Sequence, residues 1–177
     1  MTPYIGWQFD EHWNVSGIAG YNLGRTSLRN AAPVYGADYD NDQWNFQGAF
    51  NGSYMIDSVR LSPTVSLLHV TVNNRSFVDS NGARVAGTST ALDRGSAGGA
   101  LSLPMTGWEP YVRAAAEYDF SVPTGSAANG NAGGTVGVGT TIAITQAIWI
   151  SFDAGYNSIG RTGLSLWSAD ARANLRF

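Results

Sequence analysis

Strict alternation of apolar and polar residues is the most regular feature of the chain, and it is clearest at the C-terminus. From Trp167 to Phe177 every odd position is apolar, whereas every even position from Ser168 to Arg176 is polar. A period of two predicts a β-strand whose two faces meet different surroundings. The last eleven residues of the chain are therefore expected to form such a strand.

The same alternation returns along most of the chain, between segments rich in turn-forming residues. The expected strands cover residues 3–9, 13–23, 43–56, 59–73, 88–103, 108–122, 136–144, 148–157 and 167–177, with 88–103 the weakest. In 59–73 the apolar residues change parity after Leu67, so we expect a bulge or local twist there. About nine strands and no helix predict an all-β meander of hairpins in a single domain spanning residues 1–177.

Alternation is compatible with a soluble barrel, apolar inside, and with a membrane barrel, apolar outside. Aromatic residues gather near the strand ends of the apolar face, as the interfacial girdles of a membrane barrel require. The polar face carries charges of both signs together with many small residues, which suits a narrow, filled lumen. The sequence thus predicts an antiparallel up-and-down transmembrane β-barrel of about 9–10 strands, with its apolar face outward and a polar, charged lumen.

The expected connections alternate between short and long, which supports the membrane interpretation. The short ones are Asp10–His12, Asp57–Ser58, Met105–Gly107 and the turn near Gln146. The long ones cover residues 29–42, 75–88, 123–133 and 158–163. Bacterial outer-membrane barrels have short periplasmic turns and longer extracellular loops, so we assign the two ends accordingly.

The amino-acid composition argues against several classes of function. Charged residues make up 13% of the 177 residues, all ten basic residues are Arg, and the net charge is -3. Without a concentrated basic patch, nucleic acid is not expected as a partner. The absence of Cys excludes disulfides, thiol catalysis and zinc sites built on thiolates. No apolar run reaches the roughly 18 residues that a membrane-spanning helix requires, whereas a spanning strand requires only about 9–11.

Charged residues on the polar face form the first candidate site, a network in the lumen. They are Arg113, Glu117, Asp119, Asp153, Asp170, Arg172 and Arg176. Two interpretations stay open: the charges line a passage or grip a passenger segment, or they pair with one another because unpaired charge in a low-dielectric interior is costly. Since side chains nearly fill a barrel of about ten strands, a diffusion pore is not expected.

Other chemistry-bearing residues have weaker signals, and we expect neither an enzyme nor a cofactor. His12 lies in a predicted turn, and His69 shares parity with Leu67, which favours a packing or interfacial role over that of a base. A Ser-His or Asp-His hydrolase of the outer membrane would place its histidine near the extracellular rim or in a lipid-facing pocket, beside a carboxylate or a serine. Asp38, Asp40 and Asp42 could bind a divalent cation through their carboxylates, but they lack the glycine and terminal glutamate of a calcium loop. A solvated extracellular strand end is therefore favoured, and no metal site is expected.

Several short motifs occur in the order found in one family of outer-membrane proteins. They are WNVSGIAGY at residues 13–21, DYDND at 38–42 followed by Trp44 and Gly52–Tyr54, WEPY at 108–111, VGVG at 136–139, AGY at 154–156 and the terminal NLRF at 174–177. Together they resemble the C-terminal translocator, or β-domain, of bacterial autotransporters. The resemblance implies a barrel in the outer membrane of a Gram-negative bacterium, in contact with outer-membrane lipid. It also implies that Phe177, Leu175 and Trp167 form the signal read by the outer-membrane assembly machinery.

The resemblance leaves two functions open. The family's barrel has twelve strands and follows a secreted passenger, whereas about nine strands are predicted here, as if the first strand and a central hairpin were missing. Because single-chain barrels have even strand numbers, we expect at least one further strand upstream of this sequence. The chain is predicted to anchor or export a passenger polypeptide; the alternative is a stand-alone small barrel with structural or adhesive loops.

Overall fold

The structure is a computed structural model that describes residues 3–31, 34–121, 130–145 and 147–175, and every described element is a strand, turn or loop. The strands are β1 (Tyr4–Gln8), β2 (Trp13–Ala31), β3 (Val34–Gly52), β4 (Tyr54–Ile56), β5 (Val59–Asn74), β6 (Phe77–Val78), β7 (Arg84–Val85), β8 (Thr88–Ser102), β9 (Trp108–Ser121), β10 (Ala132–Ala143), β11 (Ile148–Ile159) and β12 (Trp167–Leu175).

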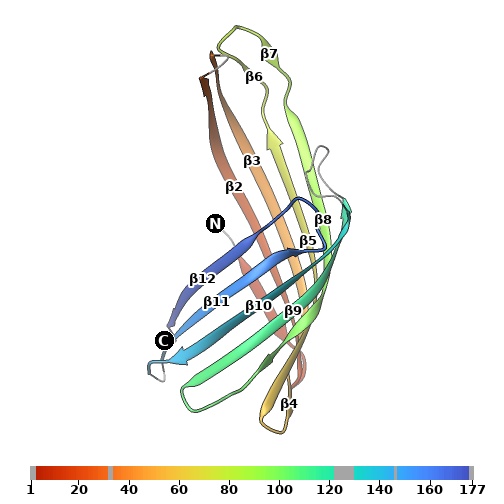
Figure 1. Ribbon diagram of the computed structural model, residues 1–177, viewed down its shortest axis with the longest axis vertical. Coiled ribbons are helices and arrows are strands. Elements are labelled where there is room, and N and C mark those ends of the chain that lie inside the picture. Colours follow the sequence, from red (N-terminus) through yellow and green to blue (C-terminus); the bar gives the residue numbers. More distant parts are fainter. Residues whose placement is uncertain (1–2, 32–33, 122–129, 146, 176–177) are drawn as a thin grey trace.

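The strands form one antiparallel meander that curls like part of a barrel wall (Figure 1). Hydrogen-bonded neighbours follow the order β1-β2-β3-β5-β8-β9-β10-β11-β12, and β4 prolongs the line of β3 alongside β5. The sheet thus has ten strands, which confirms the predicted up-and-down fold and strand number. Strands β6 and β7 form a separate hairpin. Among the described residues, β1 and β12 are the two edges of the sheet and do not pair with each other.

The short connections fall where the alternation placed them, but one predicted long loop is wrong. Residues 29–31 and 34–42 are strand and not loop, because β2 and β3 pair without interruption from Trp13↔Gly52 to Ala31↔Val34. Each of these strands has 19 residues, about twice the 9–11 that cross a bilayer. The β2–β3 hairpin therefore extends well beyond the length needed to span the membrane, at the end that carries the long connections (Figure 1).

The change of parity within β5 has a different origin from the expected bulge. The pairing of β5 with β3 and with β8 runs without a register shift from Thr64 to Asn74. Beyond Leu67 the strand instead turns polar residues to the outer face, including His69 and Thr71. Leu68 and the valines that follow it face inward. The outer face thus changes from apolar to polar along a regular strand, as expected where a strand leaves the hydrocarbon core.

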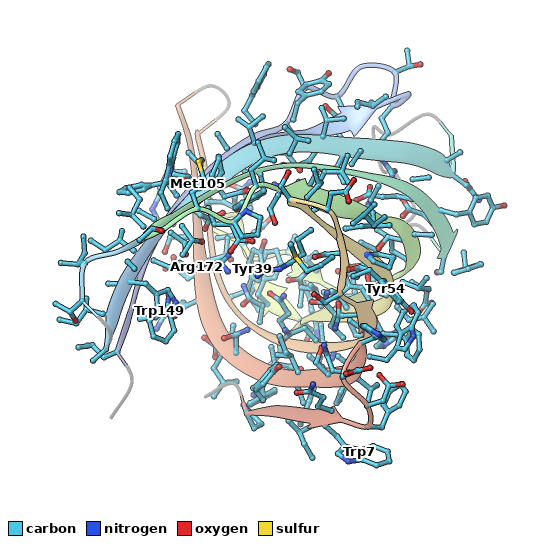
Figure 2. All side chains as sticks on the ribbon, turned by 90° about the horizontal axis from the view of Figure 1, so that it is seen from below. Trp7, Tyr39, Tyr54, Met105, Trp149 and Arg172 are labelled. Atoms are coloured by element: carbon cyan, nitrogen blue, oxygen red, sulfur yellow. The ribbon has the colours of Figure 1, made fainter. Side chains whose placement is uncertain are left out.

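The outer face of the sheet is apolar and is covered by no other part of the described chain. Ala37 is the one buried hydrophobic residue among those described, whereas Trp167 is 74% exposed, Trp7 67% and Val138 58%. Figure 2 shows Trp7 pointing away from the curl, with Tyr39 and Arg172 on its inner side. Since a soluble protein of this size buries its large apolar side chains, the outer face is built for contact with lipid. The described residues contain no helix long and apolar enough to cross a membrane.

Strand β8, the weakest of the predicted strands, lies between β5 and β9 near the middle of the sheet. Its glycines explain the weak pattern. A Cβ atom on Gly99 would lie 2.7 Å from the Ser62 carbonyl oxygen of β5, and one on Gly98 would overlap the Ala114 carbonyl of β9. The neighbouring backbones approach so closely that these positions must lack side chains, and the alternation signal is lost for that reason.

Candidate functional site on the inner face of the sheet

The first cluster of charges on the inner face joins β9 to β11 across β10. Arg113 donates from Nη2 to Asp153 Oδ1 at 2.6 Å and from Nε to Asp153 Oδ2 at 3.0 Å. Tyr111 donates its hydroxyl to Asp153 Oδ2 at 2.9 Å. Two parallel bonds from a guanidinium to one carboxylate are the strongest form of ion pair, and they also fix the orientation of both groups. Arg113 and Asp153, two of the predicted lumen residues, are therefore directly paired.

Glycines on β10 and β11 make this contact possible. A Cβ atom on Gly137 would lie 2.8 Å from Arg113 Cζ, and one on Gly155 would lie 2.7 Å from Arg113 Nη2. A Cβ atom on Gly139 would overlap the Tyr111 hydroxyl and lie 2.5 Å from the Phe152 carbonyl oxygen. The long side chains of β9 thus lie flat over strand positions that have no side chain of their own.

Replacing Gly139 with alanine is expected to lower the free energy of unfolding by about 1–3 kcal/mol, the usual cost of overpacking. The added methyl group would displace Tyr111 from Asp153. Gly48→Ala is the matched control, because a Cβ atom there meets nothing within 4 Å, and it should change stability by less than about 0.5 kcal/mol. Urea unfolding of the protein from lipid vesicles measures both changes. Equal midpoints for the two variants would contradict this packing role.

The second cluster surrounds Asp119, which is 1% exposed. Arg94 donates from Nε to Asp119 Oδ1 at 2.6 Å, and Arg161 donates from Nη1 to Asp119 Oδ2 at 2.6 Å. Glu117 Oε2 lies 3.2 Å from Arg94 Nη1 and 3.5 Å from Arg161 Nη2. Two carboxylates and two guanidinium groups thus balance one another, so that each buried charge has a partner of opposite sign.

Arg161 comes from the connection between β11 and β12 and reaches back to the inner face. The connection turns at Gly160 and Gly163, whose φ angles of 75° and 76° favour glycine. The hydrogen bond to Asp119 raises the pKa of the Arg161 guanidinium above its ordinary value, so the side chain stays charged. Arg161 itself is 6% exposed. This connection is therefore tied to β9 by ion pairs.

Sequence reasoning placed Glu117 and Asp119 in the lumen but missed both of their partners. Arg94 lies in the strand with the weakest alternation, and Arg161 lies in a loop, where parity carries no information. A third pair was also missed: Arg60 of β5 forms an ion pair with Glu109 of β9, which in addition accepts a hydrogen bond of 2.6 Å from Ser102 Oγ.

The remaining predicted lumen residues are not part of these clusters. Asp170 and Arg172 both lie on the edge strand β12, with Arg172 Nη2 3.9 Å from Asp170 Oδ1 and side chains 52% and 73% exposed. Arg176 and Phe177 lie outside the described residues. Trp167 and Leu175 project from the outer face of β12 and are 74% and 60% exposed.

The other candidates considered from the sequence lie apart from the inner face. His12 stacks on Tyr54 at a ring distance of 4.7 Å, and its Nδ1 lies 3.0 Å from the Ser53 carbonyl oxygen. Asp38 accepts a hydrogen bond of 2.6 Å from Ser27, and Asp42 accepts one of 2.9 Å from Asn73. Within the described part of the chain, no three acidic or histidine side chains are close enough to hold a metal ion.

The arrangement on the inner face is chemically a set of closed ion pairs, and the outer face is an apolar surface. A protein-family model described as "Autotransporter beta-domain" matches residues 1–167. No curated protein matches the chain. Among solved structures, one titled "NanC porin structure in rhombohedral crystal form" is similar at 10% sequence identity, with a TM-score of 0.41 and 99% of each chain covered.

Proposed function

The chain belongs to the autotransporter β-domain family of outer-membrane barrels, and from this we propose that it anchors or exports a passenger polypeptide. The observation that carries the proposal is the two-sided sheet. Its outer face exposes large apolar side chains, whereas its inner face is lined by paired charges and small residues. A wall of this kind partitions into lipid and offers a polypeptide a polar surface on the inside.

The proposed mechanism is mechanical. The outer face enters the hydrocarbon layer, and the backbone groups are satisfied by the strand ladders because lipid supplies no alternative partners. The ion pairs Arg113–Asp153 and Arg94–Asp119 tie β8, β9 and β11 together from within. A passenger segment on the inner side would then meet a rigid surface of neutralised charge, which holds an extended chain without gripping it strongly.

The passenger role is tested on the native protein recovered from an outer-membrane fraction. We expect its intact mass and N-terminal sequence to show a segment upstream of Met1 that external protease removes from whole cells. A native chain that starts at Met1 would overturn the passenger role. Absence of the protein from the outer-membrane fraction would contradict the membrane assignment itself.

Strand β12 is proposed to carry the signal for the outer-membrane assembly machinery, through Trp167, Leu175 and Phe177. Replacing Leu175 with aspartate is expected to reduce the amount of inserted protein several-fold, because it places a charge on the lipid face of this strand. The matched control is Asn174→Asp, one residue earlier on the inner face, which should insert normally. Quantitative immunoblots of outer-membrane fractions compare the two, and equal yields would contradict the assigned orientation of β12.

A second candidate function, a stand-alone barrel with adhesive or structural loops, is favoured by the long β2–β3 extension. The β6–β7 hairpin packs against this extension: Ser80 N donates to the Gly36 carbonyl oxygen at 2.8 Å, and Phe77 stacks on Tyr39 at 4.9 Å. These contacts build an ordered surface beyond the membrane. Cell adhesion that is lost on deletion of residues 75–87, in a native chain that starts at Met1, would favour this alternative over the passenger role.

A further inference from the structure

On the outer face of the sheet, the imidazole of His69 lies between the hydroxyl of Thr71 and the carboxylate of Asp93. His69 Nδ1 lies 2.6 Å from Asp93 Oδ1, and His69 Nε2 lies 2.8 Å from Thr71 Oγ1. In the tautomer with the proton on Nδ1, His69 donates to Asp93 and accepts from the Thr71 hydroxyl. A nucleophile within reach of a base that a third group orients is the geometric signature of covalent acyl transfer.

The strand register explains why these three residues meet. Thr71 follows His69 by two positions on β5 and therefore projects from the same face. Asp93 of β8 is the direct cross-strand partner of His69. The ladder between β8 and β9 is irregular between Asp93 and Arg94, so the end of β9 departs from regular pairing beside the carboxylate. Irregularities of this kind are common next to active sites, where they redirect a side chain.

The position along β5 matches the depth of a lipid ester. Toward one end of the strand the outer face carries Val65 and Leu67, which are 55% and 63% exposed. Toward the other end it carries His69, Thr71 and an asparagine. His69 and Asp93 are each 44% exposed. The three polar residues thus lie at the boundary between the apolar band and the polar extension, where the ester linkages of membrane lipids are found.

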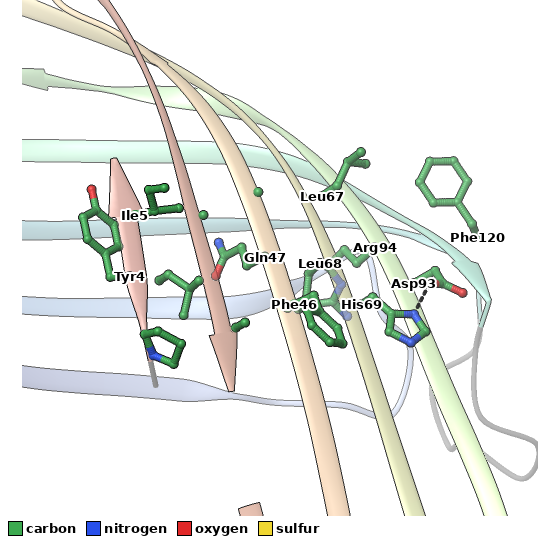
Figure 3. Close-up of a pocket in the computed structure, with 15 residues that line it drawn as sticks. Tyr4, Ile5, Phe46, Gln47, Leu67, Leu68, His69, Asp93, Arg94 and Phe120 are labelled. Atoms are coloured by element: carbon green, nitrogen blue, oxygen red, sulfur yellow. Dashed lines mark hydrogen bonds and ion pairs between the residues drawn. The ribbon is translucent and has the colours of Figure 1, made fainter. Parts of the chain in front are cut away.

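An apolar hollow leads along the outer face to His69 and Asp93. Its volume is about 740 Å³, and its lining includes Ile5, Phe46 and Leu67, with Gly17 and Gly48 between them. Figure 3 shows Ile5 at one end of the hollow and the joined pair His69 and Asp93 near the other. The shape and chemistry fit an acyl chain that lies against the sheet with its ester at the imidazole.

From this juxtaposition we propose that Thr71, His69 and Asp93 form a site that hydrolyses carboxylic esters of membrane lipids. Thr71 Oγ1 bonds to the ester carbonyl carbon while its proton passes to His69 Nε2. The bond to the alcohol oxygen breaks, and that oxygen takes the proton from Nε2, which leaves an acyl-threonine. Water then attacks the acyl carbon and gives a proton to Nε2, and the proton returns to Thr71 as the fatty acid leaves. Asp93 holds the imidazole throughout.

The chemistry favours hydrolysis over capture of a lipid phosphate, because the Asp93 carboxylate beside His69 would repel an anion. The backbone geometry at Thr71 also predicts that the enzyme is slow. Thr71 is paired with Trp44 on one side and Ala91 on the other, so its backbone is engaged in the ladders and does not form an oxyanion hole. Without an oxyanion hole from the backbone of Thr71, we expect an acceleration of roughly the 10²–10⁴-fold that a positioned base supplies.

The test is release of fatty acid from phosphatidylcholine in mixed detergent micelles by the refolded chain. Thr71→Val removes the hydroxyl and keeps the shape of the side chain, and His69→Gln removes the base. Both variants are expected to lose activity by at least about 100-fold. His12→Gln, which changes the other histidine, should retain full activity. Heat-resistant migration on gels and the urea midpoint establish that each variant is folded.

Asp93 acts through His69 and is a positioning residue, so its test differs. Asp93→Asn is expected to lower kcat with little change in KM, and to alter the pH dependence of kcat.

A long-chain alkyl fluorophosphonate should add its mass to the peptide that contains Thr71. Wild-type protein that releases no fatty acid, Thr71→Val protein as active as wild type, or an adduct on another residue would each overturn the proposal. Lipid bound equally by wild type and Thr71→Val without hydrolysis would make this a binding site only. The outcome is independent of whether a passenger exists.

Discussion

Replacing Asp119 with alanine is expected to lower the free energy of unfolding by about 3–5 kcal/mol, the cost of leaving buried charges without their partner. Asp119 accepts hydrogen bonds from both Arg94 and Arg161, each with a shortest contact of 2.6 Å, and is 1% exposed. In its absence both guanidinium groups would compete for Glu117, from which Arg161 Nη2 already lies 3.5 Å away. Urea unfolding of the protein from lipid vesicles measures the change.

The control for Asp119 is Asp170→Ala, which removes a carboxylate from an exposed pair. The Asp170–Arg172 distance of 3.9 Å and the exposure of both side chains predict a change of at most about 1 kcal/mol. The Asp119 variant should also leave the β11–β12 connection open to protease, because Arg161 would lose its shortest contact. If Asp119→Ala and Asp170→Ala unfold at the same urea concentration, the buried network does not stabilise the sheet.

Placing arginine on the outer face at Val138 is expected to destabilise the membrane-inserted state by about 2–4 kcal/mol, the cost measured for a basic residue at the bilayer midplane. Val138 is 58% exposed on β10, and it pairs with Val112 on β9 and Ala154 on β11. An arginine there would have lipid on every open side. The folding free energy into vesicles, obtained from urea titration, measures the loss.

Thr141→Arg is the matched control on the same strand. Thr141 faces inward and pairs with Glu109 of β9, so an arginine there meets a carboxylate on the polar side of the sheet. The same added charge should therefore cost less than about 1 kcal/mol. A larger loss for Thr141→Arg than for Val138→Arg would mean that the two faces have been assigned the wrong way round.

These two experiments test the inner face and the outer face of the sheet separately. The outer face is proposed to derive its stability from lipid, because Ala37 is the one buried hydrophobic residue in the described part of the chain. The inner face is held by ion pairs that span several strands, since its glycines allow long side chains to lie across their neighbours. A sheet that is stabilised in this way can present a polar inner wall and an apolar outer wall at once, which is what the proposed anchoring of a passenger requires.

The alternation in the sequence was sufficient to predict most of the strands of the sheet and the face of the residues within them. The segments 108–122 and 148–157 correspond closely to β9 (Trp108–Ser121) and β11 (Ile148–Ile159). The prediction succeeds because successive side chains of a strand point to opposite faces. A strand between an apolar and a polar environment therefore has a sequence in which apolar and polar residues alternate. The short turns were also predictable, since they interrupt the period.

The alternation pattern fails where a strand lacks an apolar stripe, and where the decisive contact lies between residues distant in the chain. The mixed polarity of residues 29–42 predicts a loop, whereas residues 29–31 of β2 and 34–42 of β3 are paired strand. Arg161 lies in a loop, where alternation does not assign a residue to either face. It nevertheless donates a hydrogen bond to Asp119, which lies 42 residues earlier in the chain.

The sequence by itself determined that this protein is an antiparallel β-sheet with one apolar and one polar face, because that information is local and repeats every two residues. Only the tertiary structure decided which charges are partners, which glycines make room for them, and that His69 meets Asp93. Those contacts depend on the register between strands. Register arises when the sheet forms as a whole, and no single segment encodes it.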